Sequence, residues 1–297
     1  MSMPIIIRPL LTLSEMYPAV ELQKTYWGDD AESVIPAHML FSLANHGGHV
    51  LAALDGEKMV GVLVGFIGTD SPYDRGKTVN LQMVSKRMVV LPEYRNRRLA
   101  ESLKLEQRDR TIELGLGLVT WTFDPLLAPN AHLNIRKLGA VCEKFVENYY
   151  GTEGSGGLSL LGSSDRLFVS WWVTHQRVTE RVEGKHINLT LKDYLDSNVP
   201  VVNPTTVGMD GMPRPAEHAQ DIAGAEALLE IPLDYPGIVR SDEGLGMAWR
   251  MHIREQLNSL MRAGYVVTDF VRAQHEGRDR GFYLLSRRDS RFGFSQN

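Results

Sequence analysis

Apolar and polar positions follow two different periods along the first 175 residues, and these periods predict alternating strands and helices. The predicted elements are, in order, a strand at 5–10, helices at 14–26 and 38–44, strands at 49–54, 60–66 and 81–91, a helix at 97–114, a strand at 116–123, a helix at 131–138, and strands at 141–150 and 166–173. Asp55-Gly56 lies between two apolar runs, which is typical of a β-hairpin. Hairpins combined with β-α-β steps predict a mixed β-sheet flanked by helices, and therefore an α/β (α+β) fold.

The remainder of the chain divides into two parts. Residues 179–220 are polar and rich in proline and glycine, and they predict a linker or extended arm. Residues 221–297 predict a smaller α/β module, with strands at 227–231, 265–271 and 281–285 and a helix from Met247 to the cap at Gly264. The predicted domains are therefore 1–178, the linker 179–220 and the module 221–297. No internal repeat is strong, although two α/β modules in tandem leave a duplication open.

Composition narrows the functional classes. Apolar residues make up 43% and charged residues 23% of the chain, as in globular proteins. There is no run of about 20 apolar residues, and the single cysteine, Cys142, excludes an internal disulfide, so we expect a cytoplasmic protein without a membrane partner. The net charge of −4 gives no global signature for nucleic acid binding. A local basic cluster between Lys86 and Arg110 indicates either a small anionic ligand or simply a solvated helix face.

The segment from Met88 to Ala100 is the most informative for chemistry. An apolar strand ends at Pro92, and a helix follows almost at once. The first backbone N–H groups of a helix lack intrahelical acceptors, and with the helix dipole they can bind phosphate oxygens. Arginines next to this turn would add charge-assisted hydrogen bonds of about 1.5–3 kcal/mol each. The candidate phosphate-binding residues are Arg95, Arg97, Arg98, Leu99 and Ala100.

This segment resembles the acetyl-CoA pyrophosphate loop of the GNAT superfamily of N-acyltransferases. The family pattern Arg/Gln-x-x-Gly-x-Gly/Ala corresponds here to Arg95-x-x-Arg98-x-Ala100. Trp121–Pro125, the helix with Asn130 and Asn134, and Lys137-Leu138-Gly139 resemble the next strand and the coenzyme-A-side helix of the family. The resemblance covers residues 5–175 and is closest to a branch with a C-terminal extension.

The resemblance implies a mechanism and a co-substrate, acetyl-CoA or another short acyl-CoA, with no metal. Two parallel strands splay apart around Met88–Val90 and Thr120–Phe123 and hold the acyl-CoA. Backbone N–H groups of Met88, Val89 and Val90 polarise the thioester carbonyl, and Asn130 and Asn134 lie on the coenzyme A side. A small amine then attacks directly in a ternary complex, without a covalent enzyme intermediate, so Cys142 is expected to be a core residue.

Two departures from the family pattern bear on catalysis. Arg98 stands where glycine is usual, and a left-handed conformation there would cost about 1–2 kcal/mol. Ile135 stands where many members carry a tyrosine that acts as the general acid near the coenzyme sulfur. Isoleucine cannot donate a proton. Tyr149 and Tyr150 are candidate acids and Asp124 is a candidate base. The simpler interpretations, two strand tyrosines and a helix-capping aspartate, are favoured for all three.

Other parts of the chain carry weaker signals. Tyr26, Trp27 and the glycine-rich segment 151–157 are candidates for the border of the acceptor pocket, and Trp249, Arg250 and Arg254 on one helix indicate core packing with surface salt bridges rather than carboxylate binding. Nucleotide, hydrolase and zinc motifs are absent from the sequence. The leading hypothesis is an N-acyltransferase acting on a small amine. The competitors are a non-catalytic acyl-CoA-binding or regulatory protein and an assembly module, and a homo-oligomer is left open.

Overall fold

The computed structural model describes residues 4–28, 34–69, 80–95, 97–152, 161–215 and 224–287. The chain forms two compact units that interleave along the sequence. The first comprises the described parts of residues 1–121 with 171–179, and the second comprises those of 122–153, 159–170 and 180–297. None of the helices in the described ranges has the length and apolar character that a bilayer span requires.

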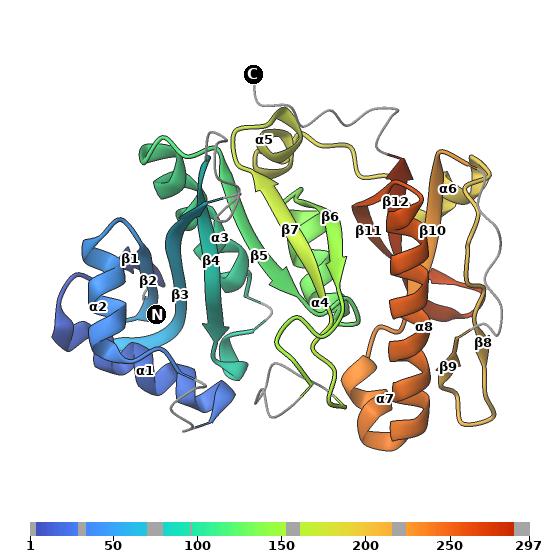
Figure 1. Ribbon diagram of the computed structural model, residues 1–297, viewed down its shortest axis with the longest axis horizontal. Helices are drawn as coiled ribbons and strands as arrows, with labels where there is room; N and C mark the ends of the chain where they lie inside the picture. Colours follow the sequence, from blue (N-terminus) through green and yellow to red (C-terminus); the bar gives the residue numbers. More distant parts are fainter. Residues whose placement is uncertain are drawn as a thin grey trace. The chain divides into compact units, whose positions relative to one another are not determined.

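The first unit has the predicted order of strands and helices (Figure 1). Its elements are β1 (Ile6–Pro9), α1 (Leu13–Trp27), α2 (Ala37–Asn45), β2 (His49–Asp55), β3 (Lys58–Thr69), β4 (Leu81–Val90), the 3-10 turn η1 (Pro92–Tyr94), α3 (Leu99–Glu113) and β5 (Leu118–Phe123), whose last two residues belong to the second unit. The strand order is β1-β2-β3-β4-β5, antiparallel except for the parallel pair β4–β5. The prediction of a mixed sheet flanked by helices is therefore confirmed.

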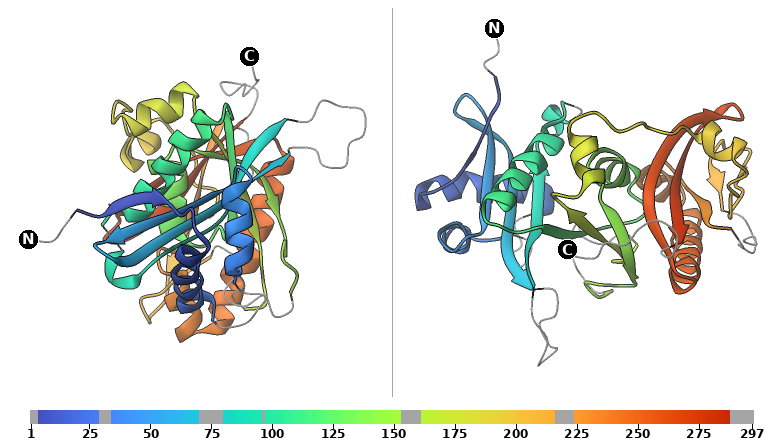
Figure 2. Two further views of the ribbon diagram at one scale, coloured as in Figure 1. Left: turned by 90° about the vertical axis from the view of Figure 1, so that its left-hand side faces the viewer. Right: turned by 90° about the horizontal axis from the view of Figure 1, so that it is seen from above.

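Helices cover both faces of this sheet because successive strand residues point to opposite sides. Val50 and Ala52 of β2 pack with residues of α1 and α2, whereas Leu51 and Ala53 pack with Leu99 and other residues of α3. Figure 2 shows α1 and α2 on one face and α3 on the other. The hairpin predicted at Asp55-Gly56 is present, and it pairs β2 with β3.

The buried face of α3 differs from the predicted one. The sequence predicted a face formed by Leu99, Ala100, Leu103 and Leu114, but Leu114 is 46% exposed. The buried positions are instead Leu99, Leu103, Lys104, Gln107 and Thr111. The helix thus turns polar side chains toward the sheet, because the apolar pattern ends at Leu103 while the packed surface continues.

The second unit contains the remaining elements. They are α4 (Ala128–Ala131), the π-helical stretch η2 (His132–Lys137), β6 (Val141–Val146), β7 (Arg166–Trp172), α5 (Gln176–Val182), α6 (Leu191–Asp196), β8 (Thr206–Val207), β9 (Pro213–Arg214), β10 (Glu226–Ile231), α7 (Tyr235–Ser241), α8 (Glu243–Arg262), β11 (Tyr265–His275) and β12 (Arg278–Arg287). Both β7 and α5 have residues in each unit. The strand order is β7-β6-β11-β12-β10, and all of these neighbours are antiparallel.

The C-terminal region joins its sheet to β6 instead of folding apart from it. Val267 of β11 pairs with Cys142 of β6, so residues 122–153 lie in the same compact unit as the C-terminal strands. This division differs from the domain boundary near residue 178 that the sequence predicted. The element order β-α-α-β-β occurs in both units, but β1 pairs with β2 whereas β10 pairs with β12, so the two arrangements differ in strand pairing.

Several short elements were missed by the sequence analysis. The predicted linker 179–220 contains α6 and the small hairpin β8–β9, and α7 precedes the predicted C-terminal helix. The α6 helix has a capping box, because the side chains of Thr190 and Asp193 bond each other's backbone N–H groups. The helix predicted at 131–138 begins at Ala128 and continues with π-type bonding, as in the Leu138 N–H to Leu133 carbonyl bond.

Candidate functional site

The turn between β4 and α3 places Arg98 in the left-handed region, with φ 61° and ψ 11°. A left-handed conformation costs a non-glycine residue about 1–2 kcal/mol. Arg98 is the N-cap of α3, and its carbonyl accepts the first hydrogen bond of the helix, from Ser102 N–H at 2.9 Å. The N–H groups of Leu99 and Ala100 therefore have no acceptor within the helix.

The guanidinium of Arg98 turns away along the helix surface. Its Nη2 donates to Glu101 Oε1 at 2.8 Å and its Nε donates to Glu101 Oε2 at 3.2 Å. These hydrogen bonds raise the pKa of Arg98 above its ordinary value. The Arg98 side chain is 76% exposed. Its positive charge offsets the negative charge of Glu101, the acidic residue in the first turn of α3. A negative ligand at this helix end consequently meets a neutralised Glu101.

Tyr94 fixes the other side of this turn to the β2–β3 hairpin. Its hydroxyl donates to Asp55 Oδ2 at 2.7 Å, and this bond raises the pKa of Tyr94. The guanidinium of Arg97 lies 5.0 Å from the centre of the Tyr94 ring, and Lys58 lies 5.4 Å from it. Arg95 and Arg97 are exposed. The turn therefore presents basic side chains around the start of α3 while its base is held to the sheet.

The parallel ladder between β4 and β5 is short. It consists of Met83↔Val119 and Val84↔Thr120, and within the described residues no later pair joins the two strands. The pairing of β4 with β3 shifts register between Arg87 and Ser85, which makes Lys86 a bulge. The resemblance implied that the two strands splay apart around Met88–Val90 and Thr120–Phe123. The ladder ends before Met88 on β4, but Thr120 of β5 is still part of it.

Residues Met88–Val90 lie on β4 beyond the end of this ladder. Leu91 N–H bonds the Val60 carbonyl of β3, at 3.0 Å. Because successive amides of a strand point to opposite sides, the N–H groups of Met88 and Val90 point away from β3, and that of Val89 points toward it. Two of the three amides predicted to polarise a carbonyl thus have the required direction, and the third is directed into the sheet.

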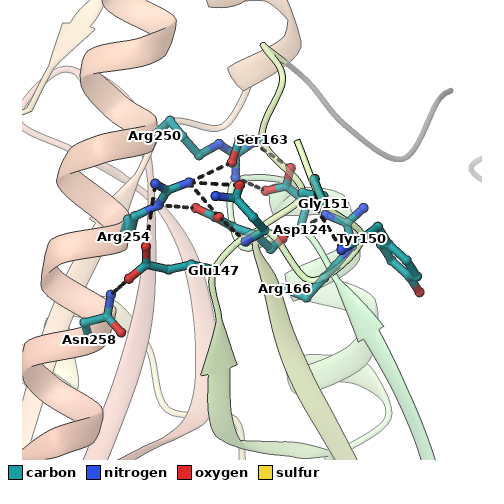
Figure 3. Close-up of polar contacts among 12 residues, drawn as sticks. Asp124, Glu147, Tyr150, Gly151, Ser163, Arg166, Arg250, Arg254 and Asn258 are labelled. Atoms are coloured by element: carbon teal, nitrogen blue, oxygen red, sulfur yellow. Dashed lines mark hydrogen bonds and ion pairs between the residues drawn. The ribbon is translucent and has the colours of Figure 1, made fainter. Parts of the chain in front are cut away.

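Asp124, the candidate base, forms a buried ion pair in the second unit (Figure 3). Arg250 of α8 donates to Oδ1 at 2.8 Å and to Oδ2 at 2.6 Å, and Oδ1 also accepts Leu126 N–H at 2.9 Å. Burial alone would lower the pKa of Arg250, but the bonds and charge of Asp124 raise it above its ordinary value. Both carboxylate oxygens are occupied. The simpler interpretation expected Asp124 to cap the next helix, but the N-cap of α4 is Leu127 without a side-chain cap bond, and the Leu126 contact belongs to the turn before that helix.

Tyr149 and Tyr150, the candidate acids, follow β6 in the second unit. Their rings meet edge to face with centres 4.7 Å apart, and Tyr149 meets Phe168 in the same way at 5.0 Å. Tyr149 is 45% exposed. Burial, with a smaller contribution from Tyr150, raises the pKa of Tyr149 and makes it a weaker acid at neutral pH. The guanidinium of Arg166 lies 5.2 Å from the centre of the Tyr150 ring.

A second arginine of α8 connects the same helix to the β6–β7 region. Arg254 donates to both oxygens of Asp165, at 3.0 and 2.8 Å, and to Ser163 Oγ at 3.1 Å. It also lies 3.6 Å from Glu147 (Figure 3). The sequence predicted surface salt bridges for Arg250 and Arg254, but Arg250 is almost fully buried and Arg254 mostly so. These partners lie 89 to 126 residues away, so no local pattern pointed to them.

The remaining candidates divide between the units. Asn130 is exposed on α4, whereas Asn134 and Ile135 are buried in η2, all in the second unit with Asp124, Tyr149 and Tyr150. The first unit contains the candidates Met88–Val90, Arg95 and Arg97–Ala100. The glycine-rich segment is outside the described residues from 153 onward. Among the residues that the structure describes, no cluster of three or more histidine, cysteine or acidic side chains could hold a metal ion.

No protein-family model and no curated protein sequence matches this chain. Solved structures do match over part of it. They include NAA60 of Arabidopsis thaliana in complex with acetyl-CoA (TM-score 0.45, 14% identity, 57% of this chain and 99% of that one). Two others are the ribosomal-protein-S18-alanine N-acetyltransferase of Escherichia coli (0.45, 14%, 58% and 96%) and a GNAT-family acetyltransferase of Streptococcus pneumoniae (0.42, 18%, 56% and 98%). The likeness extends over little more than half of this chain.

Proposed function

We propose that this chain is an acyl-CoA-dependent N-acyltransferase that transfers a short acyl group, such as acetyl, to a small amine by direct attack in a ternary complex. The observation that carries the proposal is the turn entering α3. There a left-handed Arg98 is followed by two helix-initiating amides without intrahelical acceptors, and the arginine side chain is paired with Glu101. Such an end suits a diphosphate, because amides and dipole act together on its negative charge.

The strands that precede this turn would hold the reactive end of the co-substrate. The β4–β5 ladder stops after two pairs, and the N–H groups of Met88 and Val90 point away from β3. Donors fixed in this way stabilise the negative charge that develops on a thioester carbonyl oxygen during attack. Arg95 and Arg97 would hold phosphate oxygens by charge-assisted hydrogen bonds. Asn130 and Asn134 stay candidates for coenzyme A contacts.

Proton transfer is assigned to residues other than Asp124. The attacking amine loses a proton while the thiolate gains one, so the reaction needs a base and an acid. Asp124 is committed to Arg250, and its use as a base would break a buried pair. Tyr149 is partly exposed and Tyr150 lies beside Arg166, so these two side chains are the proposed proton carriers. Burial raises the pKa of the Cys142 thiol, which suits a core residue and not a nucleophile.

A non-catalytic acyl-CoA-binding protein is the second candidate. The observation that favours it is Ile135, which is fully buried where many family members have an acidic tyrosine. This alternative keeps the diphosphate turn and the splayed strands but lacks the proton donor for the thiolate.

Two measurements separate these functions. Titration calorimetry with coenzyme A and acetyl-CoA tests the turn, and we expect binding that Ala100→Pro abolishes, because proline removes one amide at N2 and leaves the arginines in place. Release of free thiol from acetyl-CoA over a panel of small amines then tests catalysis. Absence of binding would refute both candidates, whereas binding without amine-dependent thiol release would leave the non-catalytic one.

A further inference from the structure

Lys104 is a fully buried lysine in the middle of α3. Its side chain faces the sheet of the first unit, and only 2% of the residue is exposed. The amine donates to Ser85 Oγ at 2.8 Å and to Gln107 Oε1 at 3.3 Å, and it lies 3.6 Å from the centre of the Trp121 ring. Lysine is almost never buried without a charged partner, so its place in the fold requires a reason.

The amine lies where β4 and β5 cease to pair. The last pair of their ladder is Val84↔Thr120, and the next residue of each strand is Ser85 and Trp121. These are the two strand residues that Lys104 contacts. The bulge at Lys86 follows directly on β4. In the proposed function the acyl group lies between these strands, and the lysine contacts the first residue of each strand after their ladder ends.

The cluster around this amine has hydrogen-bond donors but no anion. Neither hydrogen bond of Lys104 goes to a carboxylate, and no ion pair joins it to an acidic residue in the described parts of the chain. Gln107 is fully buried, and its Nε2 has no acceptor among the described residues. Burial lowers the pKa of Lys104 well below its ordinary value, so burial favours the neutral form of this amine. A buried donor without an acceptor is costly, and an acceptor on a ligand would relieve that cost.

The backbone makes room for this arrangement at Gly65 of β3. Gly65 pairs with Ser85, and a Cβ at this position would lie 2.8 Å from Gln107 Nε2. Glycine therefore lets the amide approach the bulge. Four features therefore occur within a few residues of one another along β3, β4 and α3. They are the end of the β4–β5 ladder, the bulge at Lys86, the Lys104 amine and the Gln107 Nε2.

We propose that the acyl group carried by the co-substrate ends in a carboxylate, which binds to Lys104 and Gln107 where the β4–β5 ladder ends. This inference rests on the proposed function and names its substrate class, the coenzyme A thioesters of dicarboxylic acids. The carboxylate supplies the missing anion to Lys104 and the missing acceptor to Gln107 Nε2. A buried and hydrogen-bonded pair of this kind discriminates strongly against an acyl chain that leaves the polar groups unpaired.

Strand geometry sets the length of the acyl chain. Met88, whose N–H is proposed to bind the thioester carbonyl, follows Ser85 by three residues, or about 10 Å at the rise of a β-strand. Two hydrogen bonds, one at each end, take up part of this span. The remainder suits an acyl group of about four or five carbons, as in succinyl or glutaryl, better than acetyl.

Proton uptake provides a signature that does not depend on turnover. Burial favours the neutral form of Lys104 in the free protein, whereas a carboxylate beside it favours the ammonium form. Binding of succinyl-CoA should therefore raise the pKa of Lys104 and be accompanied by proton uptake. An uncharged chain of the same length, butyryl, offers no such partner and should bind without this uptake.

The test is calorimetric titration of the full chain with coenzyme A, butyryl-CoA and succinyl-CoA in two buffers of different ionisation enthalpy. We expect succinyl-CoA to bind about 10- to 100-fold more tightly than butyryl-CoA and with greater proton uptake. Lys104→Met should remove both differences, whereas Lys144→Met, which removes an exposed lysine near Phe168, should keep them.

The outcomes distinguish this inference from the function on which it rests. If no coenzyme A compound binds, the proposed function and this inference both fail. If coenzyme A binds but succinyl- and butyryl-CoA have equal affinity and equal proton uptake, the carboxylate site is refuted while the diphosphate turn stands. The comparison of the two thioesters on the unaltered protein decides the question even where Lys104→Met does not fold.

Discussion

Arg250 and Asp124 are 126 residues apart in sequence, and their side chains form a bidentate ion pair that is almost completely buried. The pair holds α8 to the loop after β5. In the same loop, the Pro125 carbonyl accepts a hydrogen bond from the Tyr283 hydroxyl at 2.7 Å. Both contacts connect the C-terminal elements to the segment that carries the candidate base. The C-terminal region is thus a structural support of this loop, which explains why residues 122–153 belong to its compact unit.

Removal of one member of this pair should destabilise the protein strongly. We expect Arg250→Met to lower the free energy of unfolding by about 3–5 kcal/mol, because it leaves the Asp124 carboxylate buried without its counter-charge. Urea denaturation followed by tryptophan fluorescence measures the change. Arg262→Met, an exposed arginine at the end of the same helix, is the control and should cost less than about 1 kcal/mol. Equal effects of the two substitutions would contradict a special role for the pair.

The sequence predicted the strand, turn and helix around Arg98 because the signals for them are local, while diphosphate binding by this turn stays a prediction. An apolar run ends at Pro92, and a helix begins within seven residues, so the strand, the turn and the helix start are all read from neighbouring positions. The left-handed conformation at Arg98 was also accessible, since the family pattern has glycine there. The ladder between β4 and β5 follows from the same order of elements.

The buried polar contacts could not be predicted in the same way. Lys104 lies among charged residues of α3 and looks like a surface position, and its burial depends on where the packed face of the helix continues beyond Leu103. A local signal did exist, because Leu103, Gln107 and Thr111 recur every four residues and share one face. Asp124 and Arg250 offered no such signal, since pairing over 126 residues depends on the whole fold of the second unit.

Substitution of Arg98 by glycine tests the strain in the turn that enters α3. Arg98→Gly should raise the free energy of unfolding by up to about 1 kcal/mol, because relief of the left-handed strain outweighs the greater freedom of glycine in the unfolded chain. The exposed pair with Glu101 contributes little to stability. Arg98→Ala is the comparison, since alanine keeps the strain and loses the same pair, and it should be less stable than Arg98→Gly. A glycine variant less stable than the alanine variant would show that this residue is not strained.

His49 predicts a pH dependence of stability. Burial, with a smaller contribution from the charge of Arg110, lowers the pKa of His49 to about 4. In the unfolded chain its pKa is near 6.5, so between these values the unfolded state binds the proton more tightly. The free energy of unfolding should therefore be highest above about pH 6.5. It should fall as the pH drops toward 4, by about 2 kcal/mol after allowance for solvent screening.

The measurement for His49 is the free energy of unfolding by urea at a series of pH values. His49→Gln should flatten the slope between pH 4 and 6.5, whatever it does to stability at pH 7. The exposed His38→Gln is the control and should leave the slope unchanged. Glu15, whose pKa hydrogen bonds to the backbone of Leu11 and Thr12 lower to about 2, gives a separate decline below about pH 4.5 in every variant.

Gly65 and Gly117 form a matched pair for testing the packing around Lys104 and Gln107. A Cβ at Gly65 would lie 2.8 Å from Gln107 Nε2, 3.1 Å from the Met83 sulfur and 3.2 Å from the Val84 carbonyl oxygen. A Cβ at Gly117 would meet no atom of the described structure within 4 Å. Gly65→Ala should therefore cost about 1–3 kcal/mol through overpacking, whereas Gly117→Ala should be neutral or slightly stabilising. Thermal unfolding distinguishes the two variants. A backbone carbonyl oxygen and a neighbouring strand residue cannot move away from a new Cβ as a flexible side chain can. If Gly65→Ala leaves the stability of the protein unchanged, the Gln107 amide is not held against the bulge.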